Sequence, residues 1–130
     1  IKHNKEIISK DFIINTKEFS KVITDTAEKM SDNLLSNVVV LDVSNESSYF
    51  DYFIIGTGMT GQHLQSSGNS ISNYLKTLNI KINHKEGLSN SGWVLLDYPG
   101  IVIHLFLEDQ RNNYDLEGLW SKSSEILRIL

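Results

Sequence analysis

Three glycines, Gly56, Gly58 and Gly61, form a GxGxxG motif between an expected strand and an expected helix. Such a loop can hold a pyrophosphate, because its backbone N–H groups and the N-terminus of the next helix attract anions. The acidic residue that should bind a ribose about 20 residues later is missing, since neither Asp nor Glu occurs between Tyr52 and Lys85. We therefore interpret the glycines as turn and close-packing positions. A nucleotide-binding or nucleotidyl-transferring enzyme remains the alternative hypothesis.

The histidines, acids and serines show no other pattern of catalytic or metal-binding residues. The histidines are widely separated, with no pair at i, i+4 and no HExxH, so the sequence predicts no metal site. The chain has no cysteine, which excludes disulfides and thiolate chemistry. Asp42, Asp51 and Asp97 stand singly at expected strand ends, whereas magnesium-assisted phosphoryl transfer needs paired carboxylates. We expect no catalytic residue and no cofactor.

The stretch from Gly92 to Trp120 concentrates aromatic and acidic residues around two apolar runs, 93–96 and 101–107. Turn residues separate the runs and predict a β-hairpin. Because side chains alternate along a strand, either register puts the same residues on one mixed face: Trp93, Leu95, Asp97, Val102, His104 and Phe106. The other face is aliphatic and should be core. Pro99-Gly100 suits a type II turn, which fits a two-residue loop poorly, so we favour a four-residue loop with Trp93 opposite His104.

Trp93 and Tyr98 are candidate contacts for a protein partner, because aromatic side chains are enriched in interface hot spots. Any aromatic residue here could instead belong to the core, and the helical spacing of Trp120 with Leu116 favours that reading for Trp120. His104 lies beside Trp93 or Leu95, and we expect it to be a packed or partner-contacting histidine rather than a catalyst.

The charge distribution favours a protein partner over nucleic acid. The net charge is -4 and no basic stripe is present, which argues against binding through phosphates. An acidic patch suits a basic partner such as a ribosomal protein, although it could also be a solvated face; its members are Glu108, Asp109, Asp115 and Glu117. No apolar run approaches the roughly 18 residues of a membrane span, and signal or transit composition is lacking at the N-terminal region. We expect a cytoplasmic protein without membrane contact.

The elements that must position these residues follow from periodicity and turn signals. We predict a helix over 16–32 with a capping box of Asn15 and Glu18, strands over 38–43 and 51–56, and a helix from Thr60 to about Leu78. The middle of that second helix, 66–69, is poor in helix-forming residues and must depend on tertiary packing. A short strand over 80–83, the hairpin, a turn or short helix over 108–114, helical residues 116–120 and an apolar tail helix within 121–130 complete the chain.

These elements predict an α/β (α+β) fold, a mixed sheet of about five strands packed with helices. Residues 1–14 lack periodicity and are expected to form a loose arm, and residues 15–130 a single domain.

Several segments, taken in order, resemble the ribosomal silencing factor family, RsfS, also called Iojap. They are VVLDV at 39–43, DYFII at 51–55, KEG at 85–87 followed by GWVLLDY at 92–98, VIHLFL at 102–107 and YDLEGLW at 114–120. The resemblance covers roughly residues 19–120. It implies an α/β fold akin to nucleotidyltransferases without their catalytic carboxylates, in agreement with the unpaired acids.

The resemblance also implies a function and a partner. Members of the family bind the large ribosomal subunit through ribosomal protein L-fourteen and block joining of the small subunit, which represses translation in starvation or stationary phase. Organelle relatives assist assembly of the large subunit, and free members often form homodimers. On this resemblance we expect a non-enzymatic silencing factor, with large-subunit assembly as an alternative role of the same interface.

The partner surface of the family carries over to Trp93, Asp97 and Tyr98. We add four residues by proximity and by the face argument: Leu95, His104, Tyr114 and Leu116. The chain departs from the family pattern at Gln62, where an arginine is usual, and at the start of the second helix, which is usually rich in alanine.

Overall fold

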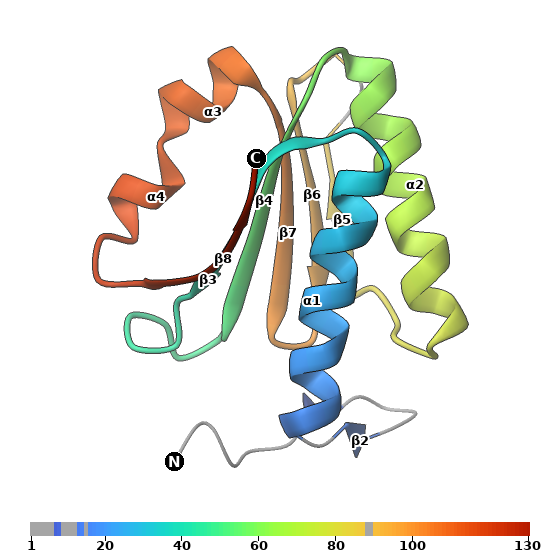
Figure 1. Ribbon diagram of the computed structural model, residues 1–130, viewed down its shortest axis with the longest axis vertical. Coiled ribbons are helices and arrows are strands. Elements are labelled where there is room, and N and C mark those ends of the chain that lie inside the picture. Colours follow the sequence, from blue (N-terminus) through green and yellow to red (C-terminus); the bar gives the residue numbers. More distant parts are fainter. Residues whose placement is uncertain (1–6, 9–12, 15, 88–89) are drawn as a thin grey trace.

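A six-stranded mixed sheet forms the centre of the protein, with helices on both of its faces (Figure 1). The computed structural model describes residues 7–8, 13–14, 16–87 and 90–130. The strand order is β5-β6-β7-β4-β3-β8, in which β4 and β7 are parallel and the other neighbours antiparallel. This confirms the mixed sheet with packed helices, with six strands rather than about five.

The sheet strands are β3 (Ser36–Asp42), β4 (Tyr52–Gly58), β5 (His84–Glu86), β6 (Trp93–Tyr98), β7 (Ile101–Leu107) and β8 (Ser124–Ile129). The helices are α1 (Thr16–Asp32), α2 (Gly61–Thr77), α3 (Glu108–Tyr114) and α4 (Leu116–Leu119). None of the helices in these described parts of the chain has the length and apolar content needed to cross a membrane.

Helices α1 and α2 lie on one face of the sheet and close the larger core. Phe19, Ile23 and Met30 of α1 bury the apolar stripe that the sequence predicts, and α1 has the expected bounds. The Thr60 hydroxyl caps α2 by accepting the backbone N–H of His63, as expected. The capping box expected at Asn15 lies outside the described residues.

The weak middle of α2 is explained by its packing. Ser67 is 1% exposed, and a Cβ placed on Gly68 would stand 3.7 Å from side-chain atoms of Leu105 and Val94. This part of α2 therefore lies directly against the side chains of β6 and β7, at ordinary van der Waals distance. Packing against the sheet therefore offsets the low helix propensity of these residues, as the sequence predicts.

The hairpin of β6 and β7 has a two-residue loop, so the four-residue loop predicted from the turn type is wrong. Trp93 lies opposite Phe106, and Leu95 lies opposite His104. Gly100 has φ 78°, as a type II turn requires, and its carbonyl accepts the backbone N–H groups of Asp51 and Tyr52 at 2.8 and 3.0 Å. Those bonds to the start of β4 hold the turn in a register that local twist alone disfavours.

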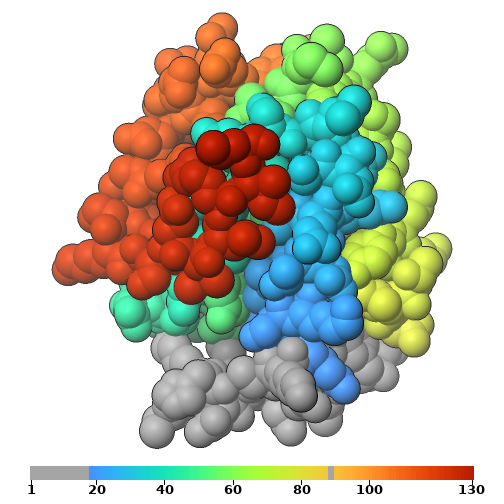
Figure 2. Space-filling model, viewed as in Figure 1, coloured from blue at the N-terminus to red at the C-terminus, as the bar shows by residue number. Residues whose placement is uncertain are grey.

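Two further predictions are wrong. The expected strand over 80–83 is instead a helix exit, in which Asn79 has φ 61° and the Ile80 N–H bonds the Leu75 carbonyl, and the short strand follows at His84–Glu86. The expected tail helix within 121–130 is strand β8, which pairs with β3. The surface of β8 is visible beside α1 in Figure 2. Leu127 and Ile129 of this strand pack against the larger core.

The expectation of a loose arm over 1–14 stays a prediction. Ile7–Ile8 (β1) and Ile13–Ile14 (β2) form a short antiparallel pair, and the rest of that segment lies outside the described residues.

Candidate functional site

The second face of the sheet carries a group of packed rings that we call the aromatic cluster: Trp93, His104, Phe106 and Tyr114. Trp93 stacks on Phe106 with ring centroids 4.9 Å apart. The ring of Tyr114 also packs against Trp93, with the centroids 4.5 Å apart. His104 and Phe106 are nearly parallel, with 9° between their planes. Alternation along β6 and β7 puts the first three rings on one face, and α3 brings Tyr114 to them. Trp93 is half-buried and Tyr114 is 47% exposed, so part of the cluster faces outward.

His104 is the polar centre of the aromatic cluster. The indole Nε1–H of Trp93 donates to His104 Nδ1 at 3.2 Å, and the imidazole is only 4% exposed. Phe53 of β4 packs against it in a T-shaped contact at 4.8 Å. Burial lowers the pKa of His104 to about 3, because a charged imidazolium is disfavoured away from water. The ring is therefore neutral at physiological pH.

The structure brings most of the predicted site residues to this one face. Leu95 and Trp93 are half-buried beside the smaller core, and Leu116 of α4 is 8% exposed within it. Asp97 follows on the same face at the turn end of β6, and its carboxyl has a raised pKa because of burial, an effect that His84 on the neighbouring strand opposes. Trp120 packs on Phe53 at 5.0 Å, in agreement with its expected core role.

Tyr98 corrects one expectation about the site. It is 1% exposed and lies in the larger core under α1 and α2, on the face opposite to Trp93. Burial raises the pKa of its hydroxyl. The extension of β6 to Tyr98 puts this side chain on the helix-covered face, so its ring does not reach a partner in this conformation.

Arg111 is a site residue that sequence reasoning missed. Its side chain is buried and donates to the Asn37 carbonyl at 2.7 Å, to Thr57 Oγ1 at 2.9 Å and to Glu117 Oε2 at 3.0 Å. The Asn37 carbonyl is available because a bulge interrupts the pairing of β3 with β4 between Ser36 and Val39. Arg111 thus ties α3 and α4 to the adjoining ends of the interior strands β3 and β4. No local pattern in the sequence distinguishes it from a surface arginine.

The acidic patch divides into two parts. Glu108, Asp109 and Asp115 are exposed, whereas Glu117 is half-buried and paired with Arg111. Asp115 Oδ1 also accepts the Gly118 N–H at the start of α4. Glu108 and Asp109 lie in the first turn of α3, the helix that brings Tyr114 to the aromatic cluster.

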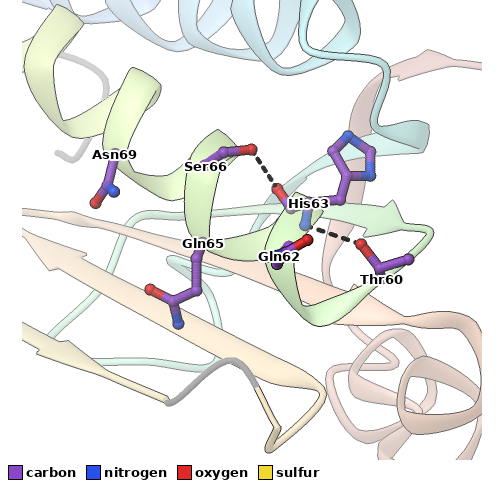
Figure 3. A pocket seen from close by; sticks show the side chains of 6 residues that line it. All are labelled: Thr60, Gln62, His63, Gln65, Ser66 and Asn69. Atoms are coloured by element: carbon purple, nitrogen blue, oxygen red, sulfur yellow. Dashed lines mark hydrogen bonds between the residues drawn. The ribbon is translucent and has the colours of Figure 1, made fainter.

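The glycine loop shows packing rather than an anion cradle. A Cβ on Gly56 would approach the terminal methyl of Met30, Cε, to 2.9 Å, so this glycine packs directly under α1. Next to the loop, an open hollow of about 710 Å³ is lined only by uncharged amides and hydroxyls and by His63. Figure 3 shows these side chains on the first turns of α2 and at Thr60. His63 is engaged with the Met59 N–H at 3.0 Å and the Asn33 carbonyl at 2.7 Å. In the part of the chain that the structure describes, no three metal-ligating side chains come together.

Comparisons with known proteins agree with one another. A family model described as "Ribosomal silencing factor during starvation" matches residues 16–129. "Ribosomal silencing factor RsfS" of Bacillus subtilis is 30% identical over 82% of this chain and 88% of its own length. A mouse protein named "Mitochondrial assembly of ribosomal large subunit protein 1" is 34% identical over 68% of this chain and 40% of its own length.

A crystal structure of a Chromobacterium violaceum protein is similar to this fold, with a TM-score of 0.74 and 29% identity. The similarity covers 78% of this chain and 85% of that one. The family model spans nearly the whole chain and the Bacillus relative covers most of it. The chain therefore belongs to the ribosomal silencing factor (RsfS) family.

Proposed function

We propose that this protein binds the large ribosomal subunit through ribosomal protein L-fourteen and silences translation by blocking the small subunit from joining. The observation that carries the proposal is the half-open aromatic cluster, in which Trp93 packs against Tyr114 of α3, the helix whose first turn carries the exposed acids Glu108 and Asp109. Membership of the silencing factor family supports association with the large subunit. On this proposal the protein needs no catalytic group, because occupying the intersubunit surface is sufficient, and it acts in the cytoplasm during starvation or stationary phase.

The physical basis of binding is an aromatic anchor with an acidic rim. Trp93 and Tyr114 offer adjoining ring surface, which is the kind of residue that dominates interface energetics. Acidic side chains speed encounter with a basic ribosomal protein and add salt dependence. Leu95 and Asp97 extend the surface along β6 toward the turn, while Leu116 and His104 support it from below.

Subunit joining is the direct test. Purified small and large subunits are mixed with and without saturating protein and separated by sedimentation. The proposal expects free subunits to accumulate and the joined ribosome to decrease. Unchanged joining at saturating protein would contradict silencing by occlusion.

Trp93→Ala tests the surface. The change should weaken binding to the large subunit by about 2 kcal/mol or more, or about thirtyfold, as loss of a hot spot does. Leu78→Ala is the matched control, because Leu78 is 40% exposed at the end of α2, on the helix-covered side. Circular dichroism must show both variants folded. Wild-type affinity in folded Trp93→Ala would remove Trp93 from the site.

A second role of the same interface is assembly of the large subunit. The name of the mouse relative favours this alternative, and organelle relatives named Iojap also match. Depletion in cells distinguishes the two roles. Loss of a silencing factor should raise translation in starved cells, whereas loss of an assembly factor should accumulate immature large subunits in growing cells. We also propose that the free protein is a homodimer, which analytical ultracentrifugation can measure.

A further inference from the structure

The polar group of the Trp93 side chain forms a hydrogen bond within the protein. An indole ring has one polar group, the Nε1–H, which can only donate. That group donates to His104 Nδ1 at 3.2 Å, and the ring itself rests on Phe106. What Trp93 offers to a partner is therefore hydrocarbon ring surface.

The position of His104 is difficult to explain by packing alone. The ring is 4% exposed among Phe53, Phe106 and Trp93, where a hydrocarbon side chain would fill the same space. Because Trp93 can only donate, His104 Nδ1 must carry the lone pair and the proton of the neutral ring must be on Nε2. Nε2 has no hydrogen-bond partner among the described residues. A buried donor without a partner is unfavourable, so the acceptor at Nδ1 is the feature that accounts for an imidazole here.

We infer that His104 is a positioning residue, which fixes the Trp93 indole in its binding orientation by accepting its N–H. This inference rests on the proposed function, because it takes Trp93 to be the anchor for the ribosomal partner. It also defines the chemistry of the contact. The partner meets Trp93 with an apolar or flat group and makes no hydrogen bond to the indole nitrogen.

Two nearly isosteric substitutions separate positioning from space filling. In His104→Asn, the carboxamide oxygen can take the place of Nδ1 and accept the indole N–H. In His104→Leu, a side chain of similar size has no acceptor. A merely structural role favours Leu in this apolar surrounding, whereas a positioning role favours Asn.

The first measurement needs no partner. The ¹⁵N-labelled protein has two indole N–H signals, from Trp93 and Trp120, which Trp93→Phe assigns. His104→Leu should shift the Trp93 signal toward that of an unbonded indole and speed its exchange with solvent by about tenfold or more, as loss of a buried hydrogen bond does. His104→Asn should keep both properties, and the Trp120 signal is the internal control. An unchanged Trp93 signal in folded His104→Leu would overturn the inference.

The second measurement is affinity for purified large subunits. His104→Leu should bind about tenfold more weakly, mainly through a faster off-rate, while His104→Asn stays within about threefold of the wild type. Equal affinity of His104→Leu and wild type would overturn the inference even if the indole signal moves. If no variant and not even the wild type binds large subunits, the proposed function fails, and the indole signal still decides whether His104 orients Trp93.

A third variant keeps the test decisive if substitution at position 104 prevents folding. In a Trp120→Phe background, Trp93 is replaced by β-(3-benzothienyl)alanine, which has sulfur in place of the indole N–H and nearly the same shape. The analogue should bind as weakly as we expect for His104→Leu. Binding equal to that of the Trp120→Phe parent would overturn the inference, because the N–H would then have no part in positioning the ring.

Discussion

Acidification should destabilise this fold through His104. The pKa of this imidazole is about 3 in the folded protein, against about 6.5 in an unfolded chain. At a pH between these two pKa values, the imidazole is protonated in the unfolded state and neutral in the folded state. Stability contributed by the neutral ring is therefore fully present above the unfolded pKa and is lost as the pH falls toward the folded one.

The magnitude follows from this difference. Each pKa unit corresponds to about 1.4 kcal/mol, so the complete effect is about 5 kcal/mol, reached only below about pH 3. Over the easily measured window from about pH 7 to about pH 4.5, the linkage gives a loss of roughly 2–3 kcal/mol. That loss is a large fraction of the 5–15 kcal/mol that stabilises a typical domain. It arises without any charged partner, because the rings packed on His104 are those of Phe53, Trp93 and Phe106.

Urea unfolding at a series of pH values measures the effect. His104→Asn is the reference, since it does not titrate and can keep the bond to Trp93. Subtracting its pH dependence from that of the wild type removes the contributions that the two proteins share. The wild type should lose stability faster than His104→Asn as the pH falls. A constant difference between the two proteins from pH 7 to 4.5 would refute the burial of a neutral imidazole at this position.

Other substitutions test the supports of the site. Arg111→Ala should lower the free energy of unfolding by about 3 kcal/mol, because it leaves Glu117 and the Asn37 carbonyl without their buried partner. Arg111→Lys should recover only part of that stability. Denaturant titration measures both variants, and a loss under about 1 kcal/mol in Arg111→Ala would contradict the stabilising role of Arg111. Gly87→Ala should destabilise the β5–β6 edge by about 1–3 kcal/mol, since Gly87 has φ 104° and a Cβ would collide with the Trp93 carbonyl; unchanged hydrogen exchange in β5 and β6 would oppose this. The double change Glu108→Gln and Asp109→Asn should slow association with large subunits and flatten its salt dependence, with little effect on the off-rate, and an unchanged on-rate would leave the acids as a solvated face.

Hydrophobic periodicity predicted most of the elements correctly. The apolar residues of α1 recur at helical spacing and therefore predict a helix. The unlike faces of β6 and β7 follow from alternation whichever register is chosen. The same alternation explains why the register itself was not predictable, because both loops put identical residues on each face. Contacts with Asp51 and Tyr52, far away in the sequence, make the choice.

The C-terminal strand β8 and the role of Arg111 could not be predicted from local sequence either, because both depend on contacts with residues far away in the chain. The apolar residues of 126–130 fit a helix or a strand equally well, and only the open edge of β3 selects a strand. Arg111 looks like any exposed arginine until the bulge at Asn37 and the side chain of Glu117 surround it. The aromatic cluster was anticipated through Trp93, His104 and Tyr114, whereas Tyr98 was misplaced because the end of β6 was set too early.

The pairing of β3 with the C-terminal strand β8 affects how the protein is made. During synthesis α1, β3 and β4 emerge before β8, and β3 and β4 can pair because a short loop joins them. The other edge of β3, with Val39 and Val40 fully buried in the finished fold, stays without its partner until residues 124–129 have been translated. An unpaired apolar edge of this kind recruits other chains. The nascent chain is therefore prone to aggregation until β8 arrives, and truncations that remove β8 should be recovered as insoluble material.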